Sequence, residues 1–316
     1  MRRALLDTKR REDQQAGNPK SARQRISGQT EELKSKQREV SRLKNELRAA
    51  KKERASGPER LKRIKSKKSE VFQLENELSG AKTGALPDFV IIGAQKCETT
   101  SFYHLLVQHP YVEPAATKEL HFFDSLFEEG IDWYRRCFPP PVWKDGRRTI
   151  TGEATPGYLF RPYVPERMTE VIPQAQLIAL LRNPVDRAYS QYHQRLRKGG
   201  EHRTFEEVII EAANKSHAQY LSRGIYVNQL LRWSKFFSDE QMLVLKSEDF
   251  FERPQETLKI VLDFLDLPHW EPEALEVRKK GSYEQKMDPD IRRRLEEYFE
   301  PHNQRLYEYL GVDFGW

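Results

Sequence analysis

The sequence predicts an α/β fold with a doubly wound central parallel sheet, preceded by a separate helical segment. Beyond Pro87, apolar runs of strand length alternate with helical patterns. Each apolar run is nearly unbroken, as expected for a strand that is buried on both faces. Two polar stretches directly follow such runs, and ligands of parallel sheets bind beyond the carboxyl ends of the strands.

The first 87 residues are expected to lie outside the α/β domain. Residues 1–28 are polar and predict a disordered basic tail. Residues 29–80 carry apolar residues at coiled-coil spacing, interrupted by Gly57-Pro58, and predict two helices or a helical hairpin. This pattern fits a coiled coil that forms a homo-oligomer or binds a partner, and it equally fits a solvated charged helix. Residues 81–87 read as a linker and 88–316 as the folded domain.

The basic charge belongs to this N-terminal part. Residues 1–84 contain 24 Lys and Arg against 12 Asp and Glu, which leaves 30 against 36 for the rest of the chain. The folded domain is therefore mildly acidic, and overall charge gives no reason to expect nucleic-acid binding. Two cysteines, Cys97 and Cys137, argue against a disulfide framework. Without an apolar signal core or a window of ~20 apolar residues, we expect no transmembrane segment and a cytoplasmic location.

The predicted elements of the domain follow in chain order. Strands are expected at 89–92, 177–181 and 242–245. Helices are expected at 102–108, 185–198, 204–213, 225–237 and 254–265.

The stretch GAQKCETTS, residues 93–101, lies between the first predicted strand and helix. A helix N-terminus offers unpaired N–H groups to an anion, and Lys96 with three hydroxyl residues adds donors. These hydroxyl residues are Thr99, Thr100 and Ser101. The stretch is P-loop-like but is not a Walker A motif, because Lys96 comes three residues after Gly93 and no Gly-Lys follows. A polar turn without a ligand is the alternative interpretation.

Two further stretches carry chemistry. Arg182, at a strand end, is suited to hold a phosphate, and Ser190 lies about two turns into the next helix. Glu119 and His121 in KELHFFD are general-base residues flanked by aromatic side chains. Taken singly, each has an ordinary alternative: a surface arginine with a capping serine, or a solvated glutamate with a packed histidine.

The ordered set of motifs resembles the sulfotransferases that use 3′-phosphoadenosine 5′-phosphosulfate (PAPS), most closely the heparan sulfate 3-O- and N-sulfotransferases. The resemblance covers residues 87–316 and rests on six stretches in family order: GAQKCETTS, KELHFFD, LRNPVDRAYSQY, GIYVNQLLRWSKFF, LVLKSEDFFERP and KKGSYEQKMDPDIRRRLEEYFEPHNQRLYEYLGVDFGW. It implies PAPS as donor, its product 3′-phosphoadenosine 5′-phosphate (PAP), and no metal. The implied acceptor is a hydroxyl or amine of a glycan, a glycolipid or a small molecule.

The resemblance also implies roles for individual residues. Glu119 matches the general base, with His121 beside it, and Lys96 would stabilise charge on the leaving phosphate. The implied donor-binding residues are Lys96, Cys97, Glu98, Thr99, Thr100, Ser101, Arg182, Ser190, Tyr226, Lys280, Gly281 and Ser282. Residues expected near the acceptor are Asp124, Trp133, Tyr158 and Arg161. Aromatic residues at these spacings also fit a hydrophobic core.

The chain departs from the family pattern at three positions. Glu98 stands where the family has glycine, which permits an unusual backbone angle and a close approach to phosphate. Ala154 stands at a basic position, and Ser282 replaces the arginine of a late loop. The alternative function is therefore a PAP- or PAPS-binding protein with reduced or no turnover. A P-loop kinase is disfavoured by the displaced lysine.

Overall fold

The computed structural model describes residues 31, 34–46, 67, 71, 84–214, 219–272 and 286–316. At the N-terminus, residues 34–46 are helical, and Val40 and Leu43 on this helix are buried. Lys67 forms an ion pair with Glu46 of this helix. The predicted tail, linker and coiled coil lie mainly outside the described residues, and oligomerisation stays a prediction.

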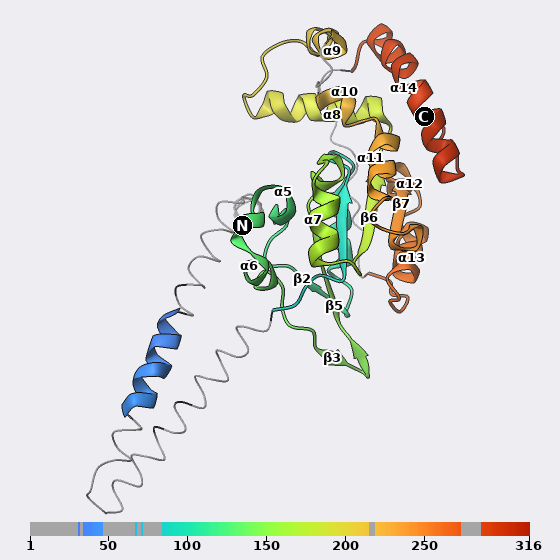
Figure 1. The fold of residues 1–316 in the computed structure, drawn as a ribbon. Helices are drawn as coiled ribbons and strands as arrows, with labels where there is room; N and C mark the ends of the chain where they lie inside the picture. The colour runs from blue at the N-terminus through green and yellow to red at the C-terminus, as the bar shows by residue number, and fades with distance from the viewer. Residues whose placement is uncertain are drawn as a thin grey trace, which may run out of the picture.

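A five-stranded parallel sheet forms the centre of the domain (Figure 1). The strand order is β2-β5-β1-β6-β7, so β1 lies in the middle. The strands are β1 (Phe89–Gly93), β2 (Val112–Pro114), β5 (Ile150–Ala154), β6 (Gln176–Leu181) and β7 (Met242–Lys246). All five residues of β1 are buried, which fits the unbroken apolar run of its sequence. The predicted α/β class and three predicted strands are confirmed.

Helices surround the sheet, and each of the five predicted helices is present with shifted ends. The α-helices are α4 (Thr99–Leu106), α5 (Phe122–Ser125), α6 (Ile131–Arg135), α7 (Val164–Val171), α8 (Pro184–Arg197), α9 (Phe205–Asn214), α10 (Gln219–Ser222), α11 (Tyr226–Trp233), α12 (Ser247–Glu252), α13 (Pro254–Phe264) and α14 (Pro289–Leu310). Short 3-10 helices are η1 (Phe127–Glu129), η2 (Tyr158–Phe160) and η3 (Asp239–Gln241). Among the described residues, no helix is both long and apolar enough to cross a membrane.

The hydrophobic interior has two parts. The larger cluster packs β1, β5 and β6 against α4, α11 and α13. The smaller cluster joins α8, α9, α10 and α14, which lie together above the carboxyl ends of the strands (Figure 1). The second cluster therefore holds α8, the helix that begins two residues after Arg182, over the edge of the sheet where ligands are expected.

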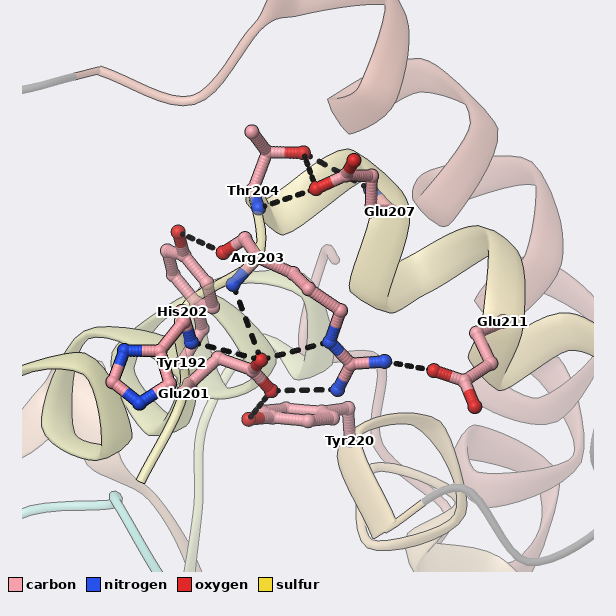
Figure 2. A network of polar contacts seen from close by, with 8 residues as sticks. All are labelled: Tyr192, Glu201, His202, Arg203, Thr204, Glu207, Glu211 and Tyr220. Atoms are coloured by element: carbon pink, nitrogen blue, oxygen red, sulfur yellow. Dashed lines mark hydrogen bonds and ion pairs between the residues drawn. The ribbon is translucent and has the colours of Figure 1, made fainter. Parts of the chain in front are cut away.

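A buried carboxylate closes the loop between α8 and α9 (Figure 2). Glu201 is 5% exposed and binds the Arg203 guanidinium through both oxygens, each at 2.9 Å. Its Oε1 also accepts the backbone N–H groups of His202 and Arg203. Tyr192 donates its hydroxyl to the Arg203 carbonyl at 2.9 Å, which ties this loop back to α8. The network is therefore tied to α8 at a position two residues beyond Ser190.

A two-stranded hairpin, β3 (Trp143–Lys144) with β4 (Arg147–Arg148), projects from the other end of the sheet (Figure 1). Ion pairs tie it to the domain: Lys144 to Glu113 at 2.9 Å, and Arg148 to Asp88 at 2.7 Å. The basic residues of the hairpin therefore serve the fold and lie away from the ligand-binding edge.

Candidate functional site

The loop after β1 leads into α4 with a left-handed backbone at two residues. Lys96 has φ 75° and Glu98, the N-cap of α4, has φ 60°. No side chain among the described residues caps the helix. The first N–H groups of α4 have no partner within the helix and face the ligand-binding edge. They belong to Thr99, Thr100 and Ser101, as the sequence predicts.

Arg182 lies at the end of β6, and its side chain reaches this loop. The residue is only 4% exposed, and its Nη1 donates to the Lys96 carbonyl at 3.4 Å. Its Nε is buried without a hydrogen-bond partner among the described residues. The nearest acid is Glu98, whose Oε1 lies 3.9 Å from Arg182 Nη1. A buried guanidinium with spare donors is suited to hold an anion.

Further contacts hold the part of the site that is predicted to bind the sulfate donor. Tyr226 donates its hydroxyl to the Arg182 carbonyl at 2.9 Å and lies 3.8 Å from Cys97 Sγ. Asn183 caps α8, accepting from the N–H groups of Val185 and Asp186. Burial lowers the pKa of Lys96, while the Glu98 carboxylate opposes this shift. Ser190 is buried on α8, two turns from its start.

Residues 118–124 lie at the end of the neighbouring strand β5 and bring several charged side chains close together. They are here called the acid-base segment. His121 lies between two carboxylates, with Nδ1 3.0 Å from Asp124 Oδ1 and Nε2 3.6 Å from Glu119 Oε2. Lys118 Nζ donates to Glu119 Oε1 at 2.9 Å. Glu119 and His121 also have left-handed backbone, with φ 59° and 55°.

The contacts within the acid-base segment set its charges. Burial raises the pKa of Glu119, but His121 and Lys118 outweigh burial and bring it to about 2. Burial lowers the pKa of His121, but Asp124 and Glu119 outweigh burial and raise it to about 9. At neutral pH the histidine is therefore protonated and Glu119 is ionised. Of the two predicted bases, Glu119 is the one with a free lone pair for a proton.

The sheet brings the two sides together. The acid-base segment is attached to the end of β5, because Glu119 N–H donates to the Ala154 carbonyl at 3.1 Å. Strand β5 pairs with β1, which leads into the Lys96 loop, and β1 pairs on its other side with β6, which leads into Arg182. Three adjacent strands thus deliver the predicted donor and acid-base residues to one edge of the sheet.

Other predicted residues lie elsewhere. Cys97 is fully buried, and its N–H already donates to the Ala94 carbonyl at 3.2 Å. Trp133 and Tyr158 are 4% and 0% exposed and pack in the core, which corrects the prediction that these side chains line an acceptor cleft. The Trp133 ring stacks on Phe122, and the Tyr158 ring meets Phe123 edge to face, so burial against other aromatic rings stabilises both side chains in the core. Arg161 is half-buried beside η2. Lys280, Gly281 and Ser282 lie outside the described residues.

Sequence reasoning missed strand β5 and its buried acid. Glu153 is fully buried and accepts hydroxyl hydrogen bonds from Tyr134 and Thr155 at 2.6 and 2.7 Å. The segment reads TGEAT, in which glycine and threonine interrupt any apolar run. A single acid between small residues was the available signal, and it is too weak to identify a strand without the sheet around it.

This arrangement agrees with comparison to known proteins. Residues 86–287 match the family model described as a sulfotransferase domain. The chain belongs to the sulfotransferase domain family. The family assignment from the motifs is therefore confirmed over most of the described domain.

Similar sulfotransferases include human heparan sulfate glucosamine 3-O-sulfotransferase 3B1, 32% identical over 259 residues. That match covers 73% of this chain and 65% of the human protein. Membrane-associated sulfotransferase kil1 of Dictyostelium discoideum is 26% identical, with 73% of this chain and 66% of that protein covered. The chain thus spans just under two thirds of the length of these relatives.

A solved structure supports the fold assignment. The crystal structure of a sulfotransferase from Alicyclobacillus acidocaldarius is 29% identical, with a TM-score of 0.60. The match covers 73% of this chain and 98% of that one. The described α/β domain is therefore a sulfotransferase fold.

Proposed function

We propose that the protein transfers a sulfuryl group from PAPS to a hydroxyl or amine of a glycan, a glycolipid or a small molecule. The observation that carries this proposal is the meeting of an anion-binding loop with an ionised acid at one edge of the sheet. The 3-O-sulfotransferase named among the relatives supports a sugar acceptor.

The donor would supply the sulfuryl group, and the residues of the chain would position and neutralise it. Lys96 and the first N–H groups of α4 are suited to the 5′ side of the donor. Arg182 and Ser190 are suited to its 3′-phosphate, since the arginine is buried and its Nε has no hydrogen-bond partner among the described residues. An in-line transfer needs mainly positioning and charge neutralisation, which these groups provide.

Glu119 is the proposed general base. It would take the proton of the acceptor as the new bond to sulfur forms and the bond from sulfur to the leaving phosphate oxygen breaks. Its low pKa makes it a weak base at rest, because His121 and Lys118 stabilise its charge. His121, already protonated, would orient Glu119 and contribute positive charge near the transferred group.

A binding experiment tests the donor. Isothermal calorimetry and thermal shift with PAP, with ATP plus Mg²⁺, and without nucleotide distinguish a PAPS-dependent protein from a kinase. Stabilisation by PAP alone supports the proposal, whereas stabilisation by ATP and Mg²⁺ alone favours a kinase and overturns it. Labelled PAPS with heparan sulfate and a panel of glycolipids and small alcohols or amines then tests turnover.

Glu98 favours a second candidate function, a PAP- or PAPS-binding protein with little turnover. Its carboxylate lies 3.9 Å from Arg182 and acts on the charge of Lys96, so it occupies the region proposed for donor phosphates. PAP binding without transfer to any acceptor in the panel would support this candidate over the enzyme.

A further inference from the structure

Three hydroxyl groups converge on the buried carboxylate of Glu153 in β5. Tyr134 donates to its Oε1 at 2.6 Å, Thr155 to its Oε2 at 2.7 Å, and Tyr158 to Oε1 at 3.4 Å. Glu153 itself is 0% exposed. A fully buried acid with this many donors is an ordered centre of contacts and not a solvated surface group.

Each of these hydroxyl residues also holds the acid-base segment. Thr155 Oγ1 accepts the His121 N–H at 3.4 Å, and the Tyr158 hydroxyl accepts the Phe123 N–H at 3.3 Å. The Tyr134 ring stacks on Phe122, with ring centroids 4.3 Å apart and an interplanar angle of 9°. Three consecutive residues, 121 to 123, are thus held through one carboxylate.

The acid-base segment needs such support because its backbone is unfavourable by itself. Glu119 and His121 both have positive φ, which costs a residue with a side chain ~1 kcal/mol or more. Strained conformations of this kind persist only when the surrounding contacts hold them in place. The Ala154 carbonyl holds Glu119 from the same strand end.

We propose that Glu153 is a positioning residue, which sets the geometry of Glu119 and His121 through Thr155, Tyr158 and Tyr134. The inference rests on the proposed sulfuryl transfer, in which Glu119 is the base. The hydrogen bonds described for Glu153 go to these three residues and not to the acid-base segment itself, so its role is positioning and not catalytic.

Two opposing influences act on the carboxyl group of Glu153: burial raises its pKa, and the hydrogen bonds from Tyr134 and Thr155 lower it. Thr155 and Tyr158 accept backbone N–H groups and donate their own hydroxyl protons to Glu153, as Tyr134 also does. In this arrangement both carboxylate oxygens accept, whereas only the oxygen of a glutamine amide can accept. Glu153→Gln keeps the size of the side chain but sets an NH₂ group against a donating hydroxyl, or breaks that contact.

A pair of Thr155 variants provides the primary test. Thr155→Val removes the hydroxyl between Glu153 and His121, whereas Thr155→Ser keeps it. We expect Thr155→Val to lower kcat for sulfate transfer to heparan sulfate by about 10- to 100-fold, since small misplacements have effects of this size. Its Kd for PAP should stay within about 2-fold of wild type, and Thr155→Ser should restore kcat. Equal kcat in wild type and Thr155→Val would overturn the proposal.

A readout independent of any acceptor separates this inference from the proposed function. In protein labelled at its histidines, NMR follows the pKa of His121, which Glu119 and Asp124 raise to about 9, with Lys118 and Glu153 also nearby. Loosening the segment should move that pKa towards 6.5 in Thr155→Val but not in Thr155→Ser, and both variants leave the charged groups around His121 in place. Glu153→Gln also changes the electrostatic interaction of Glu153 with His121, so that variant does not serve this readout. An unchanged His121 pKa in Thr155→Val overturns the inference, even if the protein turns out to transfer no sulfate.

A matched control is available on helix α4, at a residue that contacts the same strand β5. Tyr103 is buried, donates to the Gly152 carbonyl at 3.1 Å and accepts the Ala115 N–H at 3.0 Å, outside residues 118–124. Tyr103→Phe should lower the melting temperature as Thr155→Val does, but leave kcat and the His121 pKa unchanged. If Tyr103→Phe shifts both to the same extent as Thr155→Val, general destabilisation explains the effects and the positioning role is refuted.

Discussion

The two sides of the site are built by different means. The Lys96 loop and Arg182 offer main-chain N–H groups, a half-buried lysine and a buried guanidinium, and the Glu98 carboxylate lies among them. The acid-base segment is built from side chains, with Glu119 and Asp124 each in contact with His121. Anion binding by main chain and helix end depends little on side-chain identity, whereas proton transfer depends on it fully. A departure such as Glu98 can therefore change donor affinity without destroying the fold or the acid-base group.

Glu119→Gln is expected to separate the acid-base segment from the donor-binding part of the site most clearly. We expect sulfate transfer from labelled PAPS to heparan sulfate to fall by about 10²- to 10⁴-fold, because the proton acceptor is lost. The PAP affinity measured by calorimetry should not change, since Glu119 belongs to the other side. Glu128→Gln, at an exposed acid on η1, is the control. Retained turnover would assign the base to a group other than Glu119.

On the donor side, Arg182→Ala tests selectivity for the 3′-phosphate. Loss of charged hydrogen bonds should weaken PAP binding by about 10- to 100-fold. Adenosine 5′-phosphate lacks the 3′-phosphate, so its affinity should fall much less. Both affinities are measured by calorimetry, with Arg253→Ala at an exposed arginine as the control. An equal loss for both nucleotides would place Arg182 away from the 3′-phosphate.

Two substitutions at Glu98 distinguish the effect of its negative charge from the effect of its left-handed backbone. Removing a carboxylate near the phosphates should tighten PAP binding by about 5-fold, from ~1 kcal/mol of repulsion. Glu98→Gln removes the charge but keeps the side chain at φ 60°, so its melting temperature should not rise. Glu98→Gly should tighten binding and also stabilise the protein by ~1 kcal/mol. Unchanged PAP affinity in both variants would show that the Glu98 carboxylate points away from the donor.

The smallest expected effect is a pH dependence of stability from the acid-base segment. The folded pKa of His121, about 9, exceeds its ordinary 6.5, so its contribution is full below pH 6.5 and is lost as pH rises through 9. The folded pKa of Glu119, about 2, is below its ordinary 4.5, so its contribution is present above pH 4.5 and is lost as pH falls through 2.

Thermal melts of wild type and His121→Gln measure this dependence. The difference between the two melting temperatures should be largest from pH 4.5 to 6.5 and should shrink towards pH 9. His269→Gln breaks an exposed pair with Asp263 and should give a smaller difference across the range. A His121→Gln difference that does not vary with pH would contradict the charge state assigned to this histidine.

Much of the fold could be predicted from local pattern. Strands β1, β6 and β7 are apolar runs, and their order with the helices was sufficient to predict a parallel sheet. Strand β5 was missed because TGEA has no such pattern and is strand-like only between β1 and β2. Helix α14, which spans Pro289–Leu310, was also missed, and its heavily charged sequence with an internal Pro301 explains why.

The site was predictable where residue type carries chemistry. Lys96, Arg182, Glu119 and His121 were identified from motifs, and the sheet brings their segments to one edge. The roles of Trp133 and Tyr158 could not be decided, because an aromatic residue suits a core and a sugar cleft alike. The function of Glu153 depends on three partners from separate positions, and no local pattern encodes such a convergence.

The left-handed backbone of Glu119 has a consequence for engineering this protein. Glycine would adopt this backbone conformation at a lower free-energy cost than glutamate, at position 119 and also at position 98. A library screened for thermal stability alone would therefore be expected to enrich glycine at both positions. At position 98 that choice should preserve function, whereas at position 119 it would remove the base. Thermal stability and catalysis thus favour different residues at position 119, so selection for stability alone would remove the proposed catalytic base.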